Sequence, residues 1–76
     1  MDKLLISIAQ GLVDNPSAVS VTSEEGENGT TVYHLHVDPD DMGRVIGKQG
    51  RIAKAIRTVM RAAATRSNTR ISVEID

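Results

Sequence analysis

The chain has 76 residues, no cysteine and one aromatic residue, Tyr33, which allows one domain with a small core and excludes disulfides, thiolate metal sites and extended aromatic stacking surfaces. The net charge of −1 averages two opposed segments, because residues 1–43 carry one basic and eight acidic side chains whereas residues 44–70 carry eight basic and no acidic ones. Such an uncompensated positive segment favours an anionic partner.

The first segment has the spacing of an amphipathic helix. Its apolar residues recur along one face: Leu4, Leu5, Ile8, Ala9, Leu12 and Val13. We expect this helix to end at Asp14-Asn15-Pro16, because the residue before a proline disfavours helical geometry. The apolar run is too short for a signal peptide or a membrane span, so we expect a soluble, cytoplasmic protein that does not enter the membrane.

Two strands should follow. Residues 18–24 are rich in β-branched side chains, and residues 31–37 alternate between apolar and polar side chains, as half-buried strands do. The segment between them ends in Asn28-Gly29, a pair that adopts positive φ readily. We therefore predict a hairpin or two neighbouring strands joined by an exposed acidic loop.

A short helix and a long one come next. Asp38 suits an N-cap and Pro39 the first helical position, but Gly-Lys-Gln-Gly at 47–50 limits this helix to two turns. A second helix is predicted from Arg51 to Thr65, ended by Ser67-Asn68. Its apolar stripe comprises Ile52, Ala55, Ile56, Val59, Met60 and Ala63.

Alternation over 70–75 predicts a last strand. The order is α-β-β-α-α-β, and we expect an α+β fold with one three-stranded sheet and the helices packed on one face. We expect residues 1–76 to form a single domain on their own rather than part of a larger protein.

The glycine-flanked loop between the two later helices is the most informative feature. Gly47 can leave the first helix with positive φ, and Gly50 leaves the start of the next helix bare, so that a sugar-phosphate chain can approach its N–H groups. Lys48 and Gln49 at the tip can contact phosphate or sugar. Ile46 and Ile52 beside the loop form an apolar floor for a base.

Basic residues extend this surface. Arg51, Lys54, Arg57 and Arg61 step by three, three and four residues along the second helix, which places them on one stripe. Arg44, Arg51 and Lys54 are candidates for flanking phosphates. Each neutralised phosphate of a single strand contributes about −0.7 to the slope of log affinity against log salt.

The segment Val45-Ile46-Gly47-Lys48-Gln49-Gly50, followed by Ile52, resembles the I-G-x-x-G signature of KH domains, and the element order resembles their type II, or prokaryotic, arrangement. From end to end the chain is similar to the KhpA (YlqC-type) family of small bacterial RNA-binding proteins. The resemblance implies binding of about four nucleotides of single-stranded RNA. It also implies post-transcriptional regulation or RNA chaperoning that bears on cell shape and cell-wall biogenesis, with self-pairing or a KH-containing partner of the KhpB (Jag) type.

The sequence fits a phosphate-binding loop of an NTPase, a metal site or an enzyme less well. Three residues instead of four separate Gly43 from Gly47-Lys48, and Gln49 stands where a phosphate-binding loop of an NTPase needs serine or threonine. His34 and His36 share a strand face without a third clustered ligand, so we expect no metal and no cofactor. We expect no enzyme. A protein–protein adaptor, in which the fold serves mainly for dimerisation, stays open as the alternative.

Overall fold

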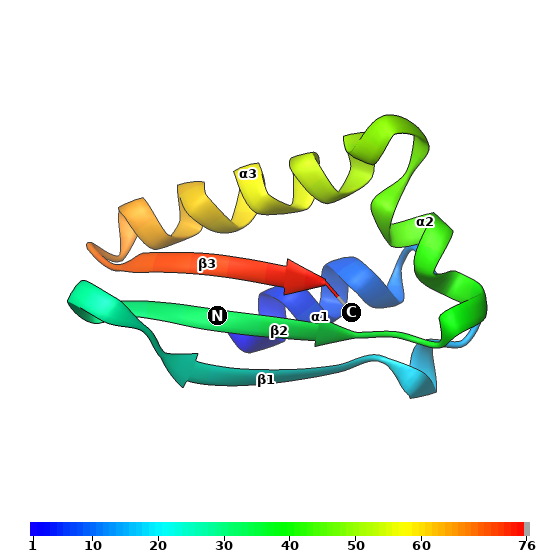
Figure 1. Cartoon of the computed structure of the whole chain (residues 1–76), viewed down its shortest axis with the longest axis horizontal. Coiled ribbons are helices and arrows are strands. Elements are labelled where there is room, and N and C mark those ends of the chain that lie inside the picture. The colour runs from blue at the N-terminus through cyan, green and yellow to red at the C-terminus, as the bar shows by residue number, and fades with distance from the viewer. Residues whose placement is uncertain (76) are drawn as a thin grey trace.

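Three α-helices and three strands follow one another in the predicted order over residues 1–75, the part of the chain that this computed structural model describes (Figure 1). The helices and strands are α1 (Asp2–Gln10), β1 (Ser20–Glu25), β2 (Thr30–His36), α2 (Met42–Ile46), α3 (Arg51–Arg66) and β3 (Arg70–Ile75). The type II order predicted from the sequence is therefore confirmed.

The sheet has the strand order β1-β2-β3. β1 and β2 are antiparallel, with Val21 opposite Leu35, whereas β2 and β3 are parallel, with Tyr33 opposite Val73. The β1–β2 turn has φ of 59° at Asn28 and positive φ at the following glycine, as predicted. In Figure 1, α1 lies behind the sheet and α3 runs along β3.

The core lies between the helices and one face of the sheet. Alternation along the strands brings Leu35 and Val73 to this face, where they pack with Leu5 of α1 and with Ile56 and Met60 of α3. Burying each large apolar side chain contributes about 1.5–3 kcal/mol. Over the described residues, no helix combines the length and apolarity needed to cross a bilayer.

The first helix is shorter than predicted, because it ends at Gln10 and not at residue 13. Gly11 is the C-cap, and glycine is the poorest helix former after proline. Leu12 and Val13 lie outside the helix yet still pack against the core. These two residues are therefore apolar because they pack against the core, and not because they continue the helix. The helical spacing in the sequence predicted a helix that was too long.

The apolar stripe predicted for α3 is only partly buried. Of its residues only Ile56 and Met60 are buried, and Val59 is 48% exposed. Ala53 and Ala64, which the predicted stripe did not include, are buried as well. The sheet covers only one side of α3. Ile52, Ala55 and Val59 instead turn toward α1, where they line a groove of about 260 Å³. We call this the α1/α3 groove; its lining is Ile8, Leu12, Ile52, Ala55, Ile56 and Val59.

Asp38 caps the segment that leads into α2, as predicted. Its Oδ1 accepts a hydrogen bond from the Asp40 N–H at 2.9 Å, and its Oδ2 accepts one from Asn15 Nδ2 at 3.1 Å. These bonds favour the ionised carboxylate, the backbone bond most strongly, and lower the pKa of Asp38 below the usual value for an aspartate. The cap joins the end of the α1 region to the start of α2.

Candidate functional site

The loop between α2 and α3, residues 47–50, has a backbone that requires glycine at its first position. Gly47 has φ 75° and ψ 175°, a region that side chains disfavour. A Cβ on Gly47 would also collide with the side chain of Ile52. The first glycine therefore lets the chain leave α2 and turn back tightly onto α3. We call residues 47–50 the GxxG loop.

The tip of the GxxG loop is open to solvent. Lys48 and Gln49 are exposed, and Gln49 has φ 57°. A Cβ placed on Gly50 would meet nothing within 4 Å. Because this glycine has no side chain and no close neighbour, another backbone can approach it closely.

Gly50 is also the N-cap of α3, and no side chain caps this end of the 16-residue helix. The aligned peptide dipoles concentrate partial positive charge at a helix N-terminus. Anions are stabilised there. The open loop therefore lies at the electropositive end of the longest helix in the described residues.

The cations of α3 add to this field. Within residues 1–75, none of the basic side chains of α3 forms an ion pair with a carboxylate. Arg51 and Lys54 are exposed in the first turns. Their charges are therefore not neutralised within the described chain, as the acid-free segment of the sequence indicated.

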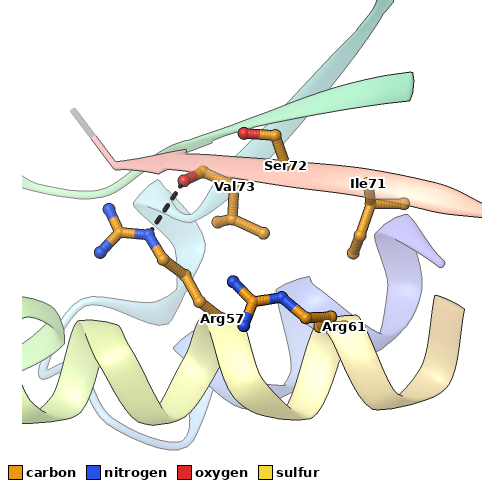
Figure 2. Close-up of a pocket in the computed structure, with 5 residues that line it drawn as sticks. All are labelled: Arg57, Arg61, Ile71, Ser72 and Val73. Atoms are coloured by element: carbon orange, nitrogen blue, oxygen red, sulfur yellow. Dashed lines mark hydrogen bonds between the residues drawn. The ribbon is translucent and has the colours of Figure 1, made fainter. Parts of the chain in front are cut away.

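Two further arginines line a cleft between α3 and β3. Arg57 and Arg61 reach from the helix toward the strand, and Figure 2 shows them with Ile71, Ser72 and Val73 around a cavity of about 100 Å³. We call it the α3/β3 cleft. The sequence singled out both arginines as members of the basic stripe, but it gave no signal for the strand residues, because the partner of a helix face is decided by tertiary packing.

Arg44 is engaged within the protein. Its Nη2 lies 2.9 Å from Asp14 Oδ2, and its Nε lies 3.6 Å from Asp41 Oδ1. Asp41 is 3% exposed, and its carboxylate accepts hydrogen bonds from the backbone N–H groups of Asp14 at 3.2 Å and Asn15 at 3.1 Å. The structure thus gives Arg44 two carboxylate partners, unlike the cations of α3.

The two isoleucines beside the GxxG loop differ in their surroundings. Ile46 is 38% exposed at the end of α2. Ile52 lies under Gly47 and lines the α1/α3 groove with Ile8 and Leu12. Of the two, Ile46 is therefore the more exposed beside the loop.

The histidines lie on the sheet face that the helices leave uncovered. His34 Nε2 is 2.9 Å from Glu24 Oε1, and His36 Nε2 is 3.4 Å from Thr22 Oγ1. Among residues 1–75 there is no cluster of three or more histidine, cysteine or acidic side chains that could hold a metal ion. The histidine pair is therefore part of a polar surface of the sheet.

A type II KH domain is defined by this combination: the order α-β-β-α-α-β, a parallel pair formed by the second and third strands, and a GxxG loop between consecutive helices. Residues 2–75 match the family model described as "KhpA/KhpB, KH domain". The chain belongs to this family.

Curated relatives cover the chain almost completely. The chain is 56% identical over 75 residues to a protein of Clostridium acetobutylicum and 51% identical to one of Listeria monocytogenes. The alignments span 99% of this chain in both cases, and 99% and 97% of the relatives. Both relatives are named RNA-binding protein KhpA.

Solved structures share the fold at low identity. Aquifex aeolicus Era superposes with a TM-score of 0.65 and 18% identity. A crystal structure of Era in complex with MgGDPNP and nucleotides 1506–1542 of 16S ribosomal RNA superposes with a TM-score of 0.65 and 19% identity. Each superposition covers 97% of this chain but 28% of the Era chain. The chain therefore spans little more than a quarter of Era, and the likeness concerns the fold alone.

Proposed function

We propose that this protein binds single-stranded RNA with the GxxG loop and the α3/β3 cleft. The observation that carries this proposal is the exposed loop at the uncapped N-terminus of α3, a helix whose cations have no carboxylate partner among residues 1–75. This arrangement suits a phosphate backbone. The name of the relatives, RNA-binding protein KhpA, agrees with it.

The loop residues hold the backbone in this proposal. Gly47 and Gly50 allow the sugar-phosphate chain to approach closely, and Lys48 and Gln49 contact phosphate or sugar. KH loops clamp about four nucleotides. One domain of this size should bind with micromolar affinity, which corresponds to about −8 kcal/mol.

Residues on either side of the loop extend the proposed contact with RNA. Arg51 and Lys54 hold flanking phosphates, and Ile46 offers its exposed apolar surface to a base. Arg44 Nη2 contacts a phosphate only by leaving Asp14, and exposed ion pairs of this kind contribute about 0–1 kcal/mol; the contact of Nε with the buried Asp41 at 3.6 Å is kept. A charge-assisted contact with an RNA phosphate can therefore offset the free energy lost with the ion pair to Asp14.

The α3/β3 cleft lets the bases lie against β3. This strand forms an edge of the sheet, so half of its backbone N–H and C=O groups do not pair with β2. The Val73 carbonyl is one of these, since it accepts a hydrogen bond from Arg57 Nε at 3.2 Å. A strand edge beside a basic helix offers hydrogen bonds to bases and charge to phosphates.

The first prediction concerns salt. We expect a fluorescein-labelled single-stranded RNA heptamer to raise its anisotropy on titration with the protein, with a slope of log affinity against log salt of about −2 for three phosphate contacts. An RNA duplex of the same length should bind more weakly, because its bases are not available to the cleft. Affinity that does not change between low and high salt would contradict the proposal.

The biological role follows the same proposal. The protein is a single KH domain without catalytic activity that works in the cytoplasm, where transcripts are available. It acts as a post-transcriptional regulator or RNA chaperone together with a second KH-containing protein of the KhpB type, whose KH domain shares its family model.

The apolar α1/α3 groove supports the second candidate function, a dimerisation or adaptor module that would pair through this groove. Its lining is apolar, and Val59, which belongs to this lining, is 48% exposed. When two copies pair across a two-fold axis, the exposed Val59 of each copy can pack against the groove of the other. The α3/β3 cleft lies on another side of α3, so pairing leaves the proposed RNA surface free.

We expect the wild-type protein to sediment as a dimer and Val59→Glu to sediment as a monomer, because the variant places a charge in the paired apolar surface. Thr58→Glu is the matched control, since Thr58 is the exposed neighbour outside the groove lining. Sedimentation velocity at several protein concentrations measures both. A wild-type monomer at all concentrations, or a dimeric Val59→Glu variant, would exclude this interface.

A further inference from the structure

The basic surface of α3 continues beyond the α3/β3 cleft onto the start of β3. Arg61 lines the cleft together with Ile71, and Arg70, the preceding residue in sequence, begins β3. Figure 1 shows the start of β3 beside the end of α3, at the opposite end of this helix from the GxxG loop. A nucleic-acid strand that follows the cleft away from the loop therefore leaves it past Arg61 and Arg70.

Arg70 is not engaged within the described chain. Its side chain is exposed and makes neither an ion pair nor a hydrogen bond with residues 1–75. The C-terminal end of α3 is capped without it, because the Thr69 N–H donates to the Ala64 carbonyl oxygen at 2.9 Å. Arg66, in contrast, lies in the last turn of α3, where a cation complements the helix dipole. The end of the helix thus accounts for Arg66 but not for Arg70.

Strand alternation places Arg70 on the sheet face that the helices leave uncovered. Ile71 lines the cleft, so Arg70 and Ser72 point the other way, and Figure 2 shows Ser72 directed away from α3. Because β3 is an edge strand, no further strand separates this face from the cleft. The long side chain of Arg70 can therefore bend around the strand edge toward a phosphate at the end of the cleft.

The distance from the loop to the end of the cleft matches the four nucleotides that KH loops clamp. Arg61 lies 11 positions after Gly50, which corresponds to about 16 Å along α3 at a rise of about 1.5 Å per residue. Four nucleotides of one strand span at least about 14 Å, because phosphates lie about 3.4 Å apart along the axis even in a stacked duplex strand. The next phosphate of a longer RNA therefore falls beyond Arg61, toward Arg70.

We propose that Arg61 and Arg70 form an exit subsite, which binds one phosphate of the RNA beyond the four nucleotides held by the GxxG loop and the cleft. Neither guanidinium group has a carboxylate partner among the described residues, and hydrogen bonds from arginine to phosphate are charge-assisted and often bidentate. The ligand is a phosphodiester, so this subsite reads charge and not sequence. The inference rests on the proposed RNA-binding function and adds a minimum length to the RNA that binds best.

The test compares RNAs of different length on the wild-type protein. Unlabelled pools of randomised tetramers and heptamers compete with a fluorescein-labelled heptamer, so that the label and any base preference affect both pools alike. A heptamer offers four registers to a site of about four nucleotides, which raises its affinity about fourfold and leaves the salt slope unchanged. A fourth phosphate contact, at the exit subsite, adds about −0.7 to that slope and about fivefold in affinity at 0.1 M salt. We therefore expect the heptamer pool to bind about 20-fold more tightly than the tetramer pool.

Arg70→Gln removes one charge of the exit subsite. We expect this variant to bind the tetramer pool like the wild-type protein, while its preference for the heptamer pool falls to about fourfold and its two salt slopes become equal. Arg66→Gln is the matched control, because it removes the same charge at the same end of α3. Arg66 lies about 140° around the helix from Arg61 at 3.6 residues per turn, so this variant should keep the wild-type preference.

The outcomes are distinct for the two proposals. Equal salt slopes for the two pools on the wild-type protein, or equal losses in Arg70→Gln and Arg66→Gln, would overturn the exit subsite and leave RNA binding in place. Weaker tetramer binding by Arg70→Gln would also overturn it, because Arg70 would then support the fold or the loop and not an exit. Failure of the labelled heptamer to bind the wild-type protein at low salt would instead overturn the proposed function.

Discussion

We expect the double substitution Lys48→Asp/Gln49→Asp to lower RNA affinity by about 100-fold or more, because it replaces a cation at the tip of the GxxG loop with two anions that face the phosphates. Like charges brought together at an interface cost several kcal/mol, and 100-fold corresponds to about 2.7 kcal/mol. Anisotropy titration with a single-stranded heptamer measures the loss.

The fold should survive this substitution. Both side chains are exposed, and aspartate tolerates the positive φ of 57° that Gln49 adopts. Carboxylates near the N-terminus of α3 also interact favourably with its dipole. The melting temperature should therefore stay within a few degrees of the wild-type value. Any loss of RNA affinity can then be assigned to the changed loop surface and not to unfolding.

Lys3→Asp/Gln10→Asp is the matched control, because it makes the same two replacements at exposed positions of α1. We expect this variant to keep most of its RNA affinity. Unchanged RNA binding by Lys48→Asp/Gln49→Asp would argue against the GxxG loop as the site. If that variant also kept its self-association, the adaptor function would become the better description.

The order of the elements could be predicted from the sequence because each boundary has a local cause. Asn28 takes positive φ in the β1–β2 turn, and Asp38 accepts the capping hydrogen bond from Asp40. The conformation of Gly47 follows from the need to reverse direction between two helices. These features depend on a few neighbouring residues, which a sequence displays directly.

The environment of α3 could not be predicted in the same way. Val59 and Met60 are neighbours in one apolar stripe, yet Met60 is fully buried and Val59 is 48% exposed. Periodicity identifies an apolar face but does not say whether a sheet, a helix or solvent covers each part of it. Likewise, the contact of Arg57 with Val73 depends on how α3 packs against β3.

Asp41 shows the same limit for a polar residue. Its position in the first turn after Asp38 suggests only a favourable interaction with the helix dipole. In the structure its carboxylate is buried and binds the backbone of Asp14 and Asn15, 27 and 26 residues away in sequence. A long-range bond of this kind has no local sequence signal.

We therefore expect Asp41→Ala to destabilise the protein by about 2–3 kcal/mol, since it leaves two partly buried N–H groups without an acceptor. For a domain of this size each kcal/mol lowers the melting temperature by about 4–8 °C, so the melting temperature should fall by about 10–20 °C. Thermal unfolding followed by circular dichroism measures the change.

Asp40→Ala is the control for this prediction, because Asp40 is the exposed neighbour of Asp41 and carries the same charge. Its side chain has no hydrogen bond or ion pair with residues 1–75, so its loss should move the melting temperature by only a few degrees. Asp41→Asn should fall between the two, because the amide keeps one acceptor oxygen but turns its NH₂ group toward donors. Equal melting temperatures for Asp41→Ala and Asp40→Ala would mean that the buried carboxylate does not tie the end of α1 to the start of α2.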